Sequence, residues 1–158
     1  MNGDFRHFTK RDKSDLRKAK TFEDLAVIAL RVLKRMHQTE RKRAHPRNIG
    51  MVSGPISTGG LGSPDANIKA MRKTIRKLEQ KGYCVFNQLP FEDPMWKIIK
   101  TPYYQGELHL LTKFYRPIFK SGFITIIHVM LNWNTSFGAT WEHKETKRFR
   151  IKQNHLTQ

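Results

Sequence analysis

The chain has 158 residues, 38% of them hydrophobic and 11% aromatic, which is enough for a globular fold with a buried core. Its formal net charge of +17 favours anionic partners such as nucleotides, nucleic acid or acidic lipid headgroups, and does not choose among them. No stretch approaches the roughly 20 apolar residues of a membrane span, the N-terminus lacks the apolar run of a secretory signal, and the single cysteine, Cys84, can form no internal disulfide, so we expect a cytoplasmic protein without a membrane partner.

The beginning of the chain is predicted to be a basic extension. Residues 1–20 are polar and dense in charge, a composition that favours a mobile arm. Thr21 can cap a helix, two acids follow in its first turn, and apolar residues then recur at helical spacing. This pattern predicts a helix over 21–42. We expect the chain to divide into an N-terminal arm and helix at 1–47 and an α/β domain at 48–158.

Strand-like and helix-like segments alternate over the rest of the chain. The predicted order is a strand at 49–52, a glycine-rich loop at 54–62, a helix from Ser63 to Gly82, a strand at 83–86, an irregular stretch at 87–106, a helix at 107–118, an apolar strand at 123–131 and a helix after Ser136. In the helix at 107–118, Leu108, Leu111 and Phe114 are expected to point inward. The strand at 123–131 is expected to be central and buried on both faces. Such an alternation predicts a parallel sheet with crossover helices.

A first candidate site follows the strand at 49–52. The segment Gly54-Pro55-Ile56-Ser57 opens the glycine-rich loop, and ligands of open α/β sheets lie beyond the carboxyl ends of the strands. Glycines let a ligand approach the backbone closely, and exposed backbone N–H groups can hold an anion. The loop has neither the Gly-Lys-Ser/Thr of a P-loop nor the spacing of a dinucleotide fingerprint. A flexible strand–helix connection without a ligand is the alternative interpretation.

A second candidate site is the segment 133–143, which follows the apolar strand and opens a helix. Ser136 fits the N-cap position, so the N–H groups of Gly138 and Ala139 are expected to face outward from a helix mouth that favours phosphate or carboxylate. Gly138 and Glu142 are four residues apart and share one helix face, and the glycine leaves room for a ligand to reach the carboxylate. Glu142 could then act as a nucleophile or a base. The alternative is an exposed glutamate in an ion pair.

These segments belong to a larger set of motifs. The chain carries Met51-Val52-Ser53-Gly54-Pro55-Ile56, Asn67, Lys81-Gly82-Tyr83-Cys84-Val85-Phe86-Asn87, and a final pattern of Trp133, Ser136-Phe137-Gly138-Ala139 and Glu142. Over about residues 48–150 this set resembles the nucleoside 2-deoxyribosyltransferase-like superfamily, and within it a small bacterial and phage branch. The final pattern is fairly specific because four positions match at fixed spacing. The basic N-terminal extension lies outside the resemblance.

The resemblance implies a flavodoxin-like or Rossmann-like three-layer α/β sandwich with a parallel sheet, often as a homodimer. It implies that Glu142 is the nucleophile on the anomeric carbon of a nucleoside sugar, with a glycosyl-enzyme intermediate resolved by a second base or by water. It also implies that Ser136 helps to hold the 5′ end of a nucleotide. The other pocket residues that it suggests are Gly54, Pro55, Ile56, Ser57, Asn67, Trp133 and Gly138. No cofactor and no metal is expected.

The chain departs from the pattern of this superfamily at several polar positions. Active members usually carry an aspartate, the general acid for the leaving base, on the strand before the final motif, whereas 121–128 contains no carboxylate. Met51 stands where a tyrosine is often found, and Ser57 where the monophosphate-hydrolase branch has an arginine. Protonation of the leaving base would fall to another residue, for which Asp93 and His128 are the candidates, although a histidine in an apolar strand is more often a core or edge residue.

Two classes of function fit these observations. The first is an N-glycosidic-bond hydrolase or deoxyribosyltransferase that acts on nucleosides or nucleotides through Glu142. The second is a non-catalytic nucleotide or nucleic-acid binding module, in which the basic surface supplies weak affinity for nucleic acid. The retained Ser136, Gly138 and Glu142 favour the enzyme, and the missing acid and tyrosine favour the binder.

Overall fold

Four parallel strands form one sheet in the computed structural model, which describes residues 2–157. Their order across the sheet is β2 (Cys84–Val85), β1 (Ile49–Ser53), β3 (Ile124–Val129) and β4 (Lys152–His155). Every pairing is parallel, β1 with β2, β1 with β3 and β3 with β4. The predictions of an α/β fold with a parallel sheet and of a strand at 49–52 are confirmed.

Two helices cover opposite faces of this sheet. α3 (Pro64–Gln80) connects β1 to β2, and α7 (Phe137–Arg148) follows the 3-10 turn η4 (Trp133–Thr135) and leads to β4. Neighbouring residues of a strand point to opposite faces. Ser53 contacts α7, whereas the next residue, Gly54, packs against Met130, which lines a hollow together with Thr74 and Leu78 of α3. The layers are therefore α3, the sheet and α7.

The boundaries of α3 and α7 follow from their caps. The Ser63 hydroxyl accepts a hydrogen bond from Ala66 N, Pro64 occupies the first turn, and Gly82 ends the helix region in a left-handed conformation with a φ of 94°. The Ser136 hydroxyl accepts from Ala139 N at the start of α7. Both helix starts are as the sequence predicts.

β3 and β4 differ more from the prediction than β1 does. β3 lies between β1 and β4, as expected of a central strand, but Thr125 is exposed, so burial on both faces holds only for residues 127–129. β4 was not predicted, because its sequence, Lys-Gln-Asn-His, has no apolar alternation. It is an edge strand, where one side needs no partner and polar side chains are tolerated.

The described residues divide into two compact units, each built from two stretches of chain. The sheet unit comprises residues 47–87 and 124–157, and the helical unit comprises residues 2–46 and 88–123. The first boundary between the units falls between residues 46 and 47. The segment 88–123, which was expected within the α/β domain, is grouped with the helical unit.

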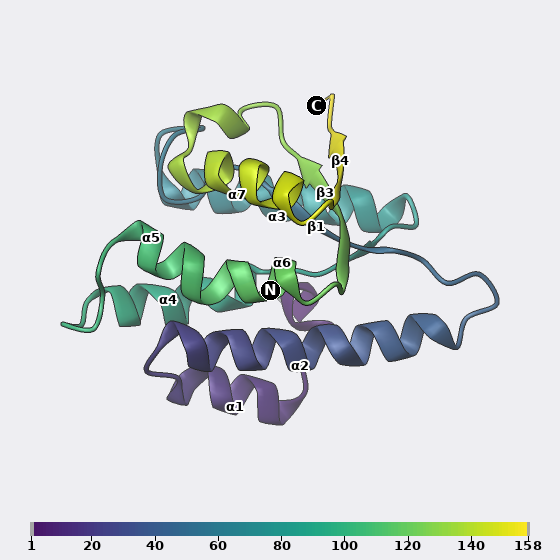
Figure 1. The fold of residues 1–158 in the computed structure, drawn as a ribbon, viewed down its shortest axis with the longest axis horizontal. Coiled ribbons are helices and arrows are strands. Elements are labelled where there is room, and N and C mark those ends of the chain that lie inside the picture. Colours follow the sequence, from purple (N-terminus) through teal and green to yellow (C-terminus); the bar gives the residue numbers. More distant parts are fainter. Residues whose placement is uncertain (1, 158) are drawn as a thin grey trace. The chain divides into compact units, whose positions relative to one another are not determined.

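The helical unit begins with two helices that lie side by side (Figure 1), α1 (Lys10–Lys18) and α2 (Phe22–Arg41), after a short 3-10 turn, η1 (Asn2–Phe5). α2 confirms the helix predicted over 21–42. The mobile arm predicted for residues 1–20 is wrong, because Thr9 caps α1 and Asp12 is fully buried in ion pairs with Arg31 and Arg35 of α2. Composition alone could not reveal these tertiary ion pairs.

The segment 88–123 is helical almost throughout. η2 (Leu89–Phe91) and α4 (Glu92–Ile99) occupy most of the stretch predicted to be irregular, and the pattern Leu89, Phe91, Met95, Ile98 supplies their buried face. Three helical elements then follow one another without a break. They are α5 (Glu107–Leu110), the π-helical turn η3 (Leu111–Tyr115) and α6 (Arg116–Lys120). Leu111 and Phe114 are buried as predicted, but Leu108 is 55% exposed. None of the helices in residues 2–157 is long and apolar enough to cross a membrane.

Candidate functional site

A hydrogen bond between a strand and a helix defines the centre of the candidate site. Ser53 is the last residue of β1, and its Oγ donates to Oε1 of Glu142 on α7 over 2.8 Å. Both side chains are buried, with 1% of Ser53 and 6% of Glu142 exposed. Glu142 is therefore not the exposed glutamate of the alternative interpretation. It is a carboxylate held at the carboxyl end of a central strand, the position where α/β sheets bind their ligands.

The loop after β1 leaves the sheet through a closely packed glycine. A Cβ on Gly54 would lie 2.4 Å from Met130 Sδ, so a larger residue there would force the Met130 side chain to move. Pro55 is buried, Ile56 is half-buried and Ser57 is exposed. All four residues of the first predicted motif thus follow β1 at the edge expected for them.

Asn67 holds this loop in shape. The side chain is only 3% exposed on α3, and its Nδ2 donates to the carbonyl oxygens of Ile56 and Gly59 over 3.0 and 3.1 Å. Its Oδ1 accepts from Leu61 N over 2.9 Å. An amide that makes three hydrogen bonds to the loop serves to shape the loop, and this accounts for Asn67 without a ligand.

The glycine-rich loop touches the start of α7. Phe137 N donates to Thr58 Oγ1, and Gly60 N donates to Thr135 Oγ1, over 3.2 and 2.8 Å. Gly59 passes so close that a Cβ there would lie 2.0 Å from the Thr135 carbonyl oxygen. The expectation that the two candidate segments are adjacent at one edge of a parallel sheet is confirmed. Thr58 and Thr135 were not predicted, because only the fold brings these two loop hydroxyls together.

An N–H group at the start of α7 that was predicted to be available to a ligand already has a hydrogen-bond acceptor. The N–H group of Ala139, which was expected to face outward, instead donates to the Oγ of Ser136, and Ser136 is 4% exposed. The prediction of an outward-facing Ala139 N–H group is wrong for this reason. Gly138 is half-buried in the first turn, one turn before Glu142 on the same face of the helix, as the spacing predicts.

His128 does not face Glu142. The imidazole is fully buried, its Nδ1 lies 2.9 Å from Asn154 Nδ2, and Tyr83 packs against the ring edge to face. Since His128 is paired with Val52, the neighbour of Ser53 in β1, it points to the opposite face of the sheet from Ser53. Burial lowers the pKa of His128. The expectation that His128 could protonate a base leaving at Glu142 is therefore wrong.

Asp93, the other candidate acid, belongs to the helical unit. It lies in the first turn of α4, and its side chain is exposed. The neighbouring Glu92 is buried, and this burial together with the charge of Asp93 raises the pKa of Glu92 to about 7. Sequence reasoning singled out Asp93 of this pair, although Glu92 has the more perturbed carboxyl group.

Trp133 forms an aromatic cluster of its own. Its ring stacks on His143 of α7 with centroids 4.0 Å apart and an interplanar angle of 9°, and His155 of β4 meets both rings at an angle. Burial, followed by the charges of Lys147 and His155, lowers the pKa of His143. One face of Trp133 is thus already covered by the His143 imidazole, so any base could stack only on its other face.

An open hollow of about 340 Å³ lies against the first turns of α7. It is lined by Asn134, Thr135, Ser136, Phe137, Thr140, Trp141 and Lys144. An α-helix turns by about 100° per residue, so Trp141 and Lys144 each lie at least about 100° around the helix axis from Glu142. This hollow therefore does not open onto the carboxylate. Among residues 2–157 there is also no group of three or more His, Cys, Asp or Glu side chains that could hold a metal ion.

No family model, no curated protein and no solved structure matches the chain.

Proposed function

We propose that the sheet unit binds a nucleoside or nucleotide at the carboxyl end of β1 and cleaves or exchanges its N-glycosidic bond with Glu142 as nucleophile. The hydrogen bond from Ser53 Oγ to Glu142 Oε1 supports this most, because it orients a buried carboxylate beside the glycine-rich loop. The proposal includes the flavodoxin-like arrangement and the homodimer that the family resemblance implies. Ser53 would act as a positioning residue.

The reaction would proceed in two steps. A carboxylate oxygen of Glu142 forms a bond to the anomeric carbon while the bond from that carbon to the base nitrogen breaks, and the base leaves with the electron pair and takes a proton from solvent. Water, or the nitrogen of a second base, then attacks the same carbon and loses its proton, which breaks the ester and restores the carboxylate. Without a positioned general acid, a factor of about 10²–10⁴ in rate is lost, so turnover is slow or needs an activated leaving group.

A second candidate function is a non-catalytic nucleotide binder. The orientation of His128 favours it, because this candidate acid points to the opposite face of the sheet from Ser53 and cannot protonate a base leaving at Glu142. At the mouth of α7, Phe137 N already donates to Thr58 and Ala139 N to Ser136. A ligand phosphate would have to displace the Thr58 hydroxyl. In such a protein Glu142 and Ser53 would serve only to join α7 to β1.

The first prediction separates these two functions by chromatographic detection of free base. A panel of nucleosides and nucleoside monophosphates is incubated with the wild type, Glu142→Gln and Ser53→Ala. We expect Glu142→Gln to lower base release by about 10³-fold or more, because glutamine keeps the shape and hydrogen-bonding oxygen but is no nucleophile. Ser53→Ala should lower kcat by about 10- to 100-fold, the value of a hydrogen bond to a charged group, and shift the acid limb of the pH–rate profile upward.

Calorimetry on the same variants provides the control. Nucleotide binding should survive in Glu142→Gln, since the glycine-rich loop and the mouth of α7 are unchanged. Equal base release by the wild type and Glu142→Gln would show that Glu142 is not the nucleophile. Nucleotide binding without base release from any substrate would establish the non-catalytic binder.

A further inference from the structure

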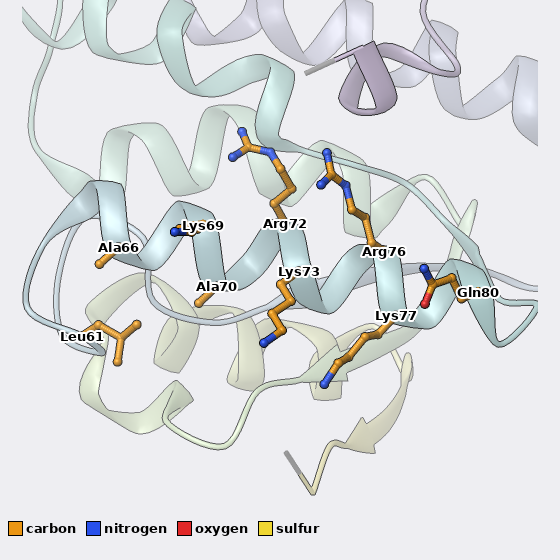
Figure 2. Close-up of a pocket in the computed structure, with 9 residues that line it drawn as sticks. All are labelled: Leu61, Ala66, Lys69, Ala70, Arg72, Lys73, Arg76, Lys77 and Gln80. Carbon is orange, nitrogen blue, oxygen red and sulfur yellow. The ribbon is translucent and has the colours of Figure 1, made fainter.

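The outer face of α3 is a dense cluster of cations. Lys69, Arg72, Lys73, Arg76 and Lys77 line an open hollow on this face together with Leu61, Ala66, Ala70 and Gln80. Figure 2 shows Arg72 and Arg76 on one side of the helix axis and Lys73 and Lys77 on the other. The buried residues of α3, which include Met71, Ile75 and Leu78, face the sheet on the opposite side of the helix. We call this surface the α3 basic face.

The lysines of the α3 basic face have no acidic partners among the described residues. Within residues 2–157, Lys69, Lys73, Arg76 and Lys77 form no ion pair, and Lys69, Lys73 and Lys77 are exposed. These three lysines are spaced four residues apart, so like charges stand next to one another along the helix. In the helical unit, by contrast, Arg31 and Arg35 are paired with Asp12. Neighbouring cations without acidic partners form a surface that is complementary to an anion with several regularly spaced charges.

A neighbouring hollow extends this surface toward the carboxyl edge of the sheet. Lys73 and Lys77 line it together with Lys81, and Met130, Leu131 and Asn132 form its opposite side. Leu131 is 65% exposed there, as Leu61 is 64% exposed in the first hollow. Cations that adjoin isolated exposed apolar side chains suit a ligand with a charged backbone and flat apolar groups.

We propose that the α3 basic face binds the phosphodiester backbone of a nucleic acid, independently of the reaction assigned to Glu142. Lys69 and Lys77 are eight residues apart, about 12 Å along the helix, a length over which a DNA duplex presents roughly seven phosphates. A lipid surface fits less well, since Leu61 and Leu131 are the only large exposed apolar side chains among the described residues that line the two hollows, and surface-bound helices need a broad apolar face. The contact is electrostatic and so depends little on base sequence.

The second prediction tests this by fluorescence anisotropy with a labelled 20-base-pair DNA duplex and its single strand, from 20 to 200 mM KCl. The wild type should bind both, more weakly as salt rises. Lys69→Gln/Lys73→Gln/Lys77→Gln should weaken duplex binding at 50 mM by about 10-fold or more and reduce the slope of log K against log salt by about 2 to 3, since each phosphate contact contributes about 0.9. Gln keeps the helix propensity near that of Lys.

A matched variant removes the same charge elsewhere. Lys34, Lys97 and Lys100 are exposed residues of the helical unit, and their joint replacement by Gln should change the affinity by less than about 3-fold. Equal losses in both triple variants would show general attraction by net charge and overturn the proposal. So would the absence of duplex binding by the wild type at 20 mM KCl, or binding only to vesicles of anionic phospholipid. Base release is measured in parallel, so a failure here is distinguishable from a failure of the glycosidic function.

Discussion

Asp12 shows how one buried carboxylate orders the beginning of the chain. It is fully buried, and its oxygens accept hydrogen bonds from Thr9 N, from Arg31 and from Arg35. Burial alone would raise the pKa of Asp12, but the Thr9 N–H group and the two guanidinium groups outweigh it and hold the pKa at about 2, below the ordinary 3.8. Since the folded chain binds this proton less readily than the unfolded chain, the carboxylate stabilises the fold above about pH 4.

The third prediction is that Asp12→Asn lowers the free energy of unfolding at pH 7 by about 2 kcal/mol, the value of a pKa difference of nearly two units. The stabilisation is lost as the pH falls from about 4 towards 2, so the wild type and the variant should converge there. Urea denaturation followed by circular dichroism at pH 7, 5, 4, 3 and 2 measures the convergence.

Asp15→Asn is the matched control for that prediction. Asp15 also pairs with Arg31, over 2.8 Å, but its side chain is 35% exposed, so its loss should cost about 1 kcal/mol or less. A constant difference between Asp12→Asn and the wild type across the pH range would contradict the role assigned to the Asp12 charge.

At the scale of elements, the contact between the glycine-rich loop and α7 gives the candidate site its shape. Gly59 and Gly62 both have positive φ, 69° and 89°, which L side chains rarely adopt. They differ in their surroundings, because a Cβ on Gly59 would collide with the backbone of Thr135, whereas nothing lies within 4 Å of a Cβ on Gly62. The pair therefore separates backbone conformation from the contact with α7.

The fourth prediction compares Gly59→Ala with Gly62→Ala. Gly62→Ala should lower the free energy of unfolding by about 1 kcal/mol, the backbone cost alone. Gly59→Ala should cost about 1–3 kcal/mol more, because the loop must move away from Thr135. Amide hydrogen exchange should show faster exchange at Gly60 and Phe137 in Gly59→Ala only. Equal costs and equal exchange in the two variants would show that the loop does not depend on this contact.

Elements with local signals could be predicted from the sequence, and those held by tertiary contacts could not. The starts of α3 and α7 follow from the capping hydroxyls of Ser63 and Ser136, and β1 follows from its apolar run. α1 has a local capping signal in Thr9 and Asp12 but no apolar pattern, and its burial rests on ion pairs with α2. β4 depends on a place at the sheet edge and has no apolar pattern either.

In the candidate site, too, features of single elements could be predicted, and pairings between elements could not. The spacing of Gly138 and Glu142 and the position of Gly54 after a strand are properties of single elements. The partnership of Ser53 with Glu142 depends on which face of β1 meets α7, and the closure of the loop over the helix mouth depends on two threonines 77 residues apart in the chain, Thr58 and Thr135. Such pairings follow from strand register and packing, which periodicity does not determine.

At the scale of the whole molecule, the excess of positive charge opposes folding. The formal net charge is +17, and a compact chain brings these charges closer together than an unfolded one does. Salt screens this repulsion, with a Debye length of about 10 Å at 0.1 M. The cost is concentrated where cations adjoin without acids between them, as on the α3 basic face.

The fifth prediction is that Lys69→Gln/Lys73→Gln/Lys77→Gln is more stable than the wild type at low salt. The variant removes like-charge pairs four residues apart, each of which destabilises a helix by about 0.2–0.5 kcal/mol, so we expect a gain of about 1 kcal/mol at 20 mM KCl. The gain should shrink as KCl rises to 500 mM, while the wild type itself becomes more stable. Thermal denaturation across this salt series measures both effects. If the lysines instead stabilised α3, the variant would be the less stable protein at every salt concentration, and the cations could not be regarded as a cost that binding to an anionic partner offsets.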